Sequence, residues 1–253
     1  MASTESFYLP EQEIFCNDGR EEDLLQFILS HPKLSELRDS PSAVLDAIDE
    51  YGRKRNFLMN VGQYKGAIIT EIISRNKPNT MLEIGGYVGY SAILFGDALR
   101  RAGGQKYVSL EMSPKFASVA RELVAVAGLD GFVEFLEGPC RQSLKKLQDK
   151  PWDIIFLDHA KADYLPDLKL CEALKLIAPG TTVIADDMKQ PGNPQYSEYV
   201  RSPPKAKRVI YNLYRDGGIA DDPPLGNPTL RDVKAYKTKD AIEISRCVDG
   251  ELK

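Results

Sequence analysis

Between residues 80 and 185, short apolar runs alternate with helical patterns, and this alternation limits the possible folds most. The apolar runs lie at 81–84, 107–110, 132–136, 154–157 and 182–185. The helical patterns between them lie at 90–101, 114–127, 141–147 and 164–177. Runs that are apolar at nearly every position predict strands buried on both faces, and strand–helix alternation predicts right-handed parallel crossovers. We therefore predict an α/β fold with a doubly wound, mostly parallel sheet.

The segments on either side of this alternation predict further elements. Residues 1–20 lack periodicity and predict an irregular arm, whereas residues 21–76 predict N-terminal helices. The amphipathic patterns of those helices lie at 24–29, 42–51 and 61–74. The segment 202–231 is rich in Pro and Gly and predicts a loop that either borders the ligand site or extends over the surface. Residues 232–253 contain a closing strand at 240–248, and we expect the whole of 1–253 to form one domain.

Charge and cysteine content exclude several classes of function. The formal net charge is −4, the wrong sign for a protein that binds nucleic acid through a basic surface. The four cysteines form no CxxC pair, and two histidines are too few for a His-rich metal site. The N-terminal residues do not resemble a signal peptide, and no apolar run approaches the roughly 18 residues of a membrane span. We expect a cytoplasmic protein without membrane insertion; the oligomeric state stays open.

A glycine-rich turn follows the first predicted strand and reads LEIGGYVGYS at 82–91. Gly85 and Gly89 would let a ligand approach the backbone without meeting a Cβ atom. The spacing differs from the GxGxxG of dinucleotide-binding folds, which argues against a nucleotide-dependent oxidoreductase. Glu111 ends the next strand, where a carboxylate can accept both hydroxyls of a ribose. Together these features favour an adenosine-containing cofactor over a tight turn and a glutamate that only caps a helix.

Three carboxylates follow two later strands of the predicted sheet. Asp158 comes after the fourth strand, and Asp186 and Asp187 come after the fifth. Parallel strands end at the same edge, and converging buried carboxylates need a cation, for which Mg²⁺ is suited. Lys161 lies close to Asp158, and a lysine partly buried beside a cation can serve as a general base. The alternatives are a polar turn, a helix cap and an inert lysine.

Several motifs, in order along the chain, resemble the catechol O-methyltransferase family, whose enzymes depend on Mg²⁺ and S-adenosylmethionine. The similarity extends from about residue 22 to residue 201. It is densest in MNVG at 59–62, LEIGGYVGYSA at 82–92, FLDH at 156–159 and YLPD at 164–167. The resemblance implies a Rossmann-like methyltransferase fold with a seven-stranded sheet, extra N-terminal helices, and a cofactor and metal core at 80–201.

The resemblance also implies a role for each matched residue. The residues that would line S-adenosylmethionine are Val61, Glu83, Gly85, Tyr87, Ser91, Glu111, Met112 and His159. The residues that would bind Mg²⁺ are Asp158, Asp186 and Asp187. Lys161 would be the catalytic base. The residues that would border an aromatic substrate are Phe57, Met59, Ala160 and Pro191.

The chain departs from the family pattern at several of these positions. Phe57 and Ala160 stand where the family has tryptophans, which predicts room for substituted catechols. Asp187 replaces an Asn, and Cys140-Arg141 replaces a Ser-Gln pair beside the adenine. The family's C-terminal substrate-contacting glutamate is matched to no residue here.

The resemblance implies methyl transfer from S-adenosylmethionine to one hydroxyl of a catechol-type vicinal diol. The alternatives are another aromatic diol, such as a caffeoyl-type ester or a flavonoid, and a catalytically silent relative that binds S-adenosylmethionine. The regiochemistry on a catechol and the physiological acceptor stay open.

Overall fold

A computed structural model describes residues 14, 16–202, 209–213 and 241–249. In these residues a single sheet has the strand order β3-β2-β1-β4-β5-β7-β6. Its strands are β1 Thr80–Ile84, β2 Lys106–Glu111, β3 Val133–Glu137, β4 Ile154–Leu157, β5 Thr182–Ala185, β6 Ile210–Leu213 and β7 Glu243–Val248. The first five strands pair in parallel, and β7 pairs antiparallel with both β5 and β6. The predicted seven-stranded, mostly parallel sheet is confirmed.

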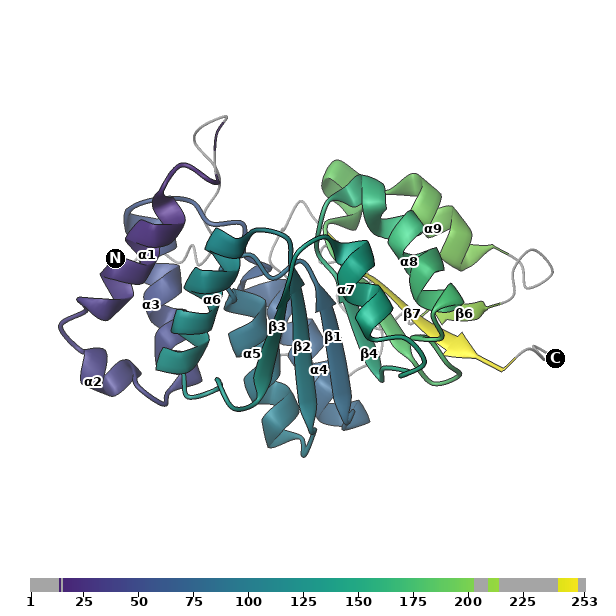
Figure 1. The fold of residues 1–253 in the computed structure, drawn as a ribbon, viewed down its shortest axis with the longest axis horizontal. Coiled ribbons are helices and arrows are strands. Elements are labelled where there is room, and N and C mark those ends of the chain that lie inside the picture. The colour runs from purple at the N-terminus through teal and green to yellow at the C-terminus, as the bar shows by residue number, and fades with distance from the viewer. Residues whose placement is uncertain (1–13, 15, 203–208, 214–240, 250–253) are drawn as a thin grey trace.

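Helices cover both faces of the sheet (Figure 1). The helices are α1 Arg20–Leu29, α2 Leu34–Leu37, α3 Pro41–Lys54, α4 Gly62–Asn76, α5 Tyr90–Arg101, α6 Pro114–Val126, α7 Cys140–Lys146, α8 Tyr164–Ala173 and α9 Pro194–Arg201. A 3-10 turn at Lys161–Asp163 follows β4, and a π-helical turn at Met188–Gly192 follows β5. None of the helices in the described ranges is long and apolar enough to cross a bilayer.

Alternate residues of the central strands enter two separate hydrophobic layers. Ile154 and Phe156 of β4 pack with the apolar faces of α3, α4, α5 and α6. Ile155 and Leu157, the residues between and after them, pack with α8 and α9 on the opposite face. Because successive strand side chains point to opposite faces, a strand covered on both sides must be apolar throughout. The sequence expectation of strands buried on both faces is therefore confirmed.

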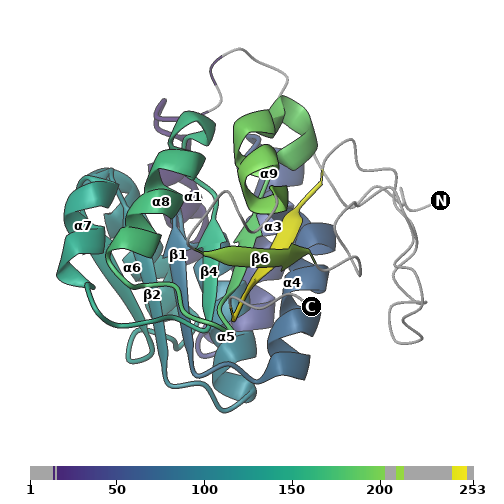
Figure 2. The same ribbon diagram turned by 90° about the vertical axis from the view of Figure 1, so that its right-hand side faces the viewer.

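The predicted element boundaries need four corrections. Residues 210–213, which we expected in the Pro/Gly-rich loop, form the edge strand β6 (Figure 2). Only these four residues pair with β7, so the strand is short. The closing strand starts at Glu243 rather than at 240. Helix α8 ends at Ala173, and the apolar residues after it are buried in a loop. Helix α2 was not predicted. Most of the arm 1–20 and of the loop 202–231 lie outside the described residues.

Candidate active site

The turn after β1 and the residues after β4 meet at the carboxyl edge of the sheet. Gly85 has a φ of 102°, a left-handed conformation that strains any residue with a side chain. A Cβ atom there would lie 2.3 Å from the backbone oxygen of Asp158. The predicted cofactor turn and the predicted metal site are therefore in direct contact, and only glycine permits this approach.

The carboxylate of Glu111 is fixed against the glycine turn. It accepts hydrogen bonds from the backbone N–H groups of Gly86 at 3.2 Å and Tyr87 at 2.8 Å. Its other oxygen accepts from the N–H of Ser113 at 2.7 Å, just before α6. Glu111 therefore braces the turn, and its contact with a ribose stays a prediction.

Glu83 is a fully buried carboxyl group on β1. The hydroxyl of Ser109 on β2 donates a hydrogen bond to it at 2.6 Å. Burial raises the pKa of Glu83 from 4.5 to about 7, because an ionised carboxylate loses its hydration in this position. Glu83 is therefore a titrating group within the predicted cofactor site.

Replacing Glu83 with Gln is expected to change how stability depends on pH. The folded state binds more protons at Glu83 than the unfolded chain between pH 4.5 and about 7, so stability falls as pH rises through that window. The neutral Glu83→Gln variant lacks this loss and should gain about 3 kcal/mol relative to the wild-type protein between pH 4 and pH 8. Urea unfolding of both proteins across that range measures the difference. A difference that does not vary with pH would contradict the expectation.

The three predicted carboxylates converge as expected from the ends of parallel strands. Asp158, Asp186 and Asp187 each offer an oxygen within 4.8 Å of the others. We call them the acidic cluster. Asp186 is buried, and Asp187 has a φ of 53°, a left-handed conformation that Asp and Asn tolerate better than most residues. Burial and the neighbouring charge of Asp186 raise the pKa of Asp158 well above its usual range.

Two lysines face the acidic cluster. The Nζ atom of Lys65, on α4, lies 2.8 Å from Asp186 Oδ1 and 2.9 Å from Asp187 Oδ1. The Nζ atom of Lys161 lies 3.0 Å from Asp187 Oδ2 and 3.5 Å from Asp158 Oδ1. Three carboxyl groups face two ammonium groups, so ionisation of all three leaves an excess of negative charge, consistent with the raised pKa of Asp158. An oxygen-only donor set with this charge fits a hard divalent cation such as Mg²⁺.

Tyr164 orients the ammonium group of Lys161. Lys161 Nζ donates to the phenol oxygen at 2.5 Å, and the phenol donates to the backbone oxygen of Asp186 at 3.2 Å. Burial and the nearby charge of Asp158 raise the pKa of Tyr164, so the phenol keeps its proton. Lys65 and Tyr164 had been given no role in the sequence analysis. Tyr164 lies in the motif YLPD, which could have indicated it, whereas Lys65 lies outside MNVG and its own helix gives no such signal.

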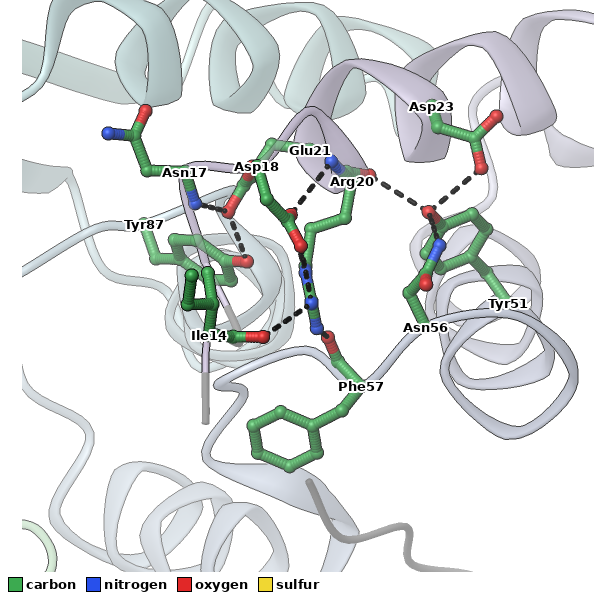
Figure 3. Close-up of polar contacts among 10 residues, drawn as sticks. All are labelled: Ile14, Asn17, Asp18, Arg20, Glu21, Asp23, Tyr51, Asn56, Phe57 and Tyr87. Atoms are coloured by element: carbon green, nitrogen blue, oxygen red, sulfur yellow. Dashed lines mark hydrogen bonds and ion pairs between the residues drawn. The ribbon is translucent and has the colours of Figure 1, made fainter. Parts of the chain in front are cut away.

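The N-terminal helix α1 ties the glycine turn to the segment before α4 (Figure 3). The hydroxyl of Tyr87 donates to Glu21 Oε1 at 2.8 Å. Arg20 Nη1 donates to the backbone oxygen of Phe57 at 2.7 Å, and its guanidinium pairs with Asp18. These two buried residues of α1 were missed in the sequence analysis because an Arg-Glu pair in an acidic helix start looks like a solvated surface.

The remaining predicted residues differ in how exposed they are. Val61 and Ser91 are buried, Phe57 is half-buried, and Ala160 is exposed. The residues left accessible for a ligand include Met59, 36% exposed, and Met112, 73% exposed. His159 Nε2 lies 3.2 Å from Asp167 Oδ2, beside Cys140. The side chain of Pro191 lies outside what the structure describes.

Comparisons with known proteins find similarity to O-methyltransferases. A family model described as a methyltransferase domain matches residues 82–188. Catechol O-methyltransferase B of Danio rerio is 35% identical over 201 residues, which cover 78% of this chain and 75% of that protein. Catechol O-methyltransferase of Bos taurus is 33% identical over 76% of this chain and 70% of its own length.

A solved structure of similar fold is the O-methyltransferase from Bacillus cereus in complex with SAH. It superposes with a TM-score of 0.58 at 22% identity, and the match covers 94% of both chains. The fold is therefore the Rossmann-like fold of such methyltransferases. With its ordered motifs, its converging edge residues and this identity across most of its length, the chain belongs to the catechol O-methyltransferase family.

Proposed function

We propose that this protein transfers a methyl group from S-adenosylmethionine to one hydroxyl of a catechol-type vicinal diol. The observation that carries the proposal is the contact between Lys161 and the acidic cluster, directly beside the turn at Gly85. A methyl donor at the glycine turn and a diol at the acidic cluster would then be neighbours. Holding two reactants in line can supply a large part of a rate, with effective molarities of about 10⁵ M or more.

The acidic cluster would hold Mg²⁺ through Asp158, Asp186 and Asp187. When bound, Mg²⁺ would lower the pKa of a chelated phenol and fix both hydroxyls. A chelating site of this kind selects acceptors with two adjacent oxygens. The proposal therefore predicts that monophenols are poor substrates.

Lys161, once it has given its own proton to the solvent and is a neutral amine, would accept the proton of the reacting hydroxyl at Nζ. Its position supports this role, because the side chain is 19% exposed and its Nζ atom is held by Tyr164 and Asp187. A base so restrained keeps its distance to a diol bound at the acidic cluster. Tyr164 holds the lysine in place without itself losing a proton.

The residues around the glycine turn would bind the methyl donor. Glu111 would accept the ribose hydroxyls, with its carboxylate already fixed by two backbone N–H groups of the turn. Met112 directly follows Glu111 and is exposed, and it would cover the adenine. Tyr87 and Ser91 would border the methionine part, and the bond from Tyr87 to Glu21 restrains the tyrosine ring.

Methyl transfer to catechol tests the proposal directly. Purified protein is incubated with labelled S-adenosylmethionine and catechol, with Mg²⁺ or with an excess of chelator, and labelled product is counted. We expect turnover with Mg²⁺ and its loss with chelator. Cofactor binding by calorimetry without turnover would reject the catechol acceptor but keep the methyl donor. Absence of both turnover and binding would reject the whole proposal.

The acceptor side of the site predicts a steric preference. Ala160 is exposed and small, so it leaves space beside the acidic cluster for substituents on the aromatic ring. The Ala160→Trp variant should raise KM for a catechol with a bulky substituent by about tenfold and change KM for catechol itself much less. The indole would take the space of the substituent, and the contact that the substituent loses is worth roughly 1–3 kcal/mol. Steady-state kinetics with both acceptors measures the ratio. Equal changes for the two acceptors would show that Ala160 does not border the substrate.

A further inference from the structure

We propose that Cys140, His159 and Asp167 form a second divalent-metal site, selective for borderline-soft cations such as Zn²⁺. We call these residues the Cys–His–Asp cluster. One ligand atom from each lies within 4.8 Å of the other two. Sulfur, imidazole nitrogen and carboxylate oxygen are the donors that Zn²⁺ takes in proteins. Three protein donors leave the fourth tetrahedral position open for water. The acidic cluster, by contrast, offers oxygen alone.

Three rigid elements bring the Cys–His–Asp cluster together. Cys140 is the first residue of α7, His159 follows β4, and Asp167 lies in α8, the helix that packs beside α7 (Figure 1). Asp167 is 2% exposed and the side chain of His159 is 13% exposed. The side chains are therefore largely removed from water before any cation binds, which lowers the cost of ordering them.

The spacing of two donors already matches a tetrahedral site. His159 Nε2 and Asp167 Oδ2 lie 3.2 Å apart. Two tetrahedral zinc ligands with bonds of about 2.0–2.1 Å are separated by roughly 3.3 Å. A cation can therefore replace the proton between these atoms after a reorientation of the two side chains, because a tetrahedral ion lies off the line that joins them. Cys140 would turn its sulfur toward the same point.

The surroundings orient both donors. Arg141 Nε donates to Asp167 Oδ1 at 3.1 Å, which leaves Oδ2 facing the imidazole. The ring of His159 stacks on Tyr164 with centroids 5.0 Å apart, which fixes its plane.

Zinc binding would displace the thiol proton of Cys140. Zinc binds cysteine as the thiolate, so this proton passes to the solvent when the ion binds. A second consequence rests on the proposed function. His159 is one of the predicted cofactor residues, so Zn²⁺ in the Cys–His–Asp cluster and S-adenosylmethionine would exclude each other.

Zinc titration of the full chain, without cofactor, tests the site. Protein competes with a chromophoric chelator for Zn²⁺, and the same protein is loaded with Co²⁺ to record the thiolate-to-metal absorption band. We expect one tightly bound ion and a thiolate band. Cys140→Ser should weaken binding at least about 100-fold and abolish the band, since loss of a mere outer-shell partner already costs about 10–100-fold.

Two further variants keep the test decisive. Cys16→Ser removes another partly buried thiol, far along the chain, and should leave zinc affinity unchanged. Asp167→Asn should weaken zinc binding even if Cys140→Ser fails to fold, which circular dichroism would reveal. Equal zinc affinity in the wild-type protein and both cluster variants would overturn the proposal, as would a Co²⁺ spectrum without a thiolate band.

A competition experiment separates this site from the proposed function. Calorimetric titration with S-adenosylmethionine is repeated with the Cys–His–Asp cluster loaded with Zn²⁺, and we expect the apparent Kd of the cofactor to rise at least tenfold. Unchanged cofactor binding would refute the mutual exclusion while leaving the metal site intact. Failure of the zinc titration leaves methyl transfer to catechol unaffected, and failure of methyl transfer leaves the zinc titration valid.

Discussion

Lys161→Met is expected to lower kcat for methyl transfer by about 10²–10⁴-fold, the range attributed to a positioned acid–base group. The affinity for S-adenosylmethionine should change little, because Lys161 faces the acidic cluster rather than the glycine turn. The reason for the large effect is that the reacting hydroxyl would lose the group that removes its proton. Single-turnover kinetics gives the chemical step, and calorimetry gives the cofactor Kd.

Lys161→Arg is the matched control for this experiment. A guanidinium keeps the positive charge that pairs with Asp187 and Asp158, but it does not lose a proton at accessible pH. If Lys161 acts as a base, the Arg variant should be nearly as slow as the Met variant while folding as well as the wild-type protein. An Arg variant with near-normal kcat would show that the charge of Lys161 matters and that its proton transfer does not.

The central strands and the acidic cluster could be predicted because both depend on local sequence. A strand buried on both faces is apolar at each position, and strand ends in a parallel sheet meet at one edge whatever the helices do. Asp158 and Asp186 each follow an apolar run directly, so the second rule places both at one edge without any knowledge of packing. The edge strand β6 could not be recognised, because four residues between Pro- and Gly-rich segments carry too little periodicity.

Residues whose partners lie far away in sequence could not be predicted. Lys65 is separated from Asp187 by 122 positions, and nothing in its own helix indicates that it faces a carboxylate. Arg20, the first residue of α1, likewise donates to the backbone oxygen of Phe57, 37 positions away. A lysine or arginine on an amphipathic helix is usually solvated, so only the tertiary contacts reveal that these two belong to the site.

Lys65→Met is expected to destabilise the metal-free protein strongly. Its ammonium group pairs with Asp186 and Asp187 at 2.8 and 2.9 Å, in a position where the lysine side chain is 12% exposed and Asp186 is 2% exposed. Removing one partner from a buried ion pair leaves an uncompensated charge and costs about 3–5 kcal/mol. For a chain of this length that loss lowers Tm by roughly 10 °C. Differential scanning calorimetry in the presence of chelator measures it.

The same variant should bind Mg²⁺ more tightly, by at least about tenfold, because no ammonium group then competes for the two carboxylates. A higher Kd for Mg²⁺ in calorimetric titration would instead show that Lys65 supports the metal-bound form.

Asp187→Asn supplies the matched second change, because Asn keeps an oxygen donor and tolerates the left-handed backbone. In the Lys65→Met/Asp187→Asn double variant, one positive and one negative charge are removed together, so Tm without metal should recover much of the loss. Additive losses would mean that Lys65 and Asp187 stabilise the protein independently, and the charge balance of the acidic cluster would then rest on Lys161 alone.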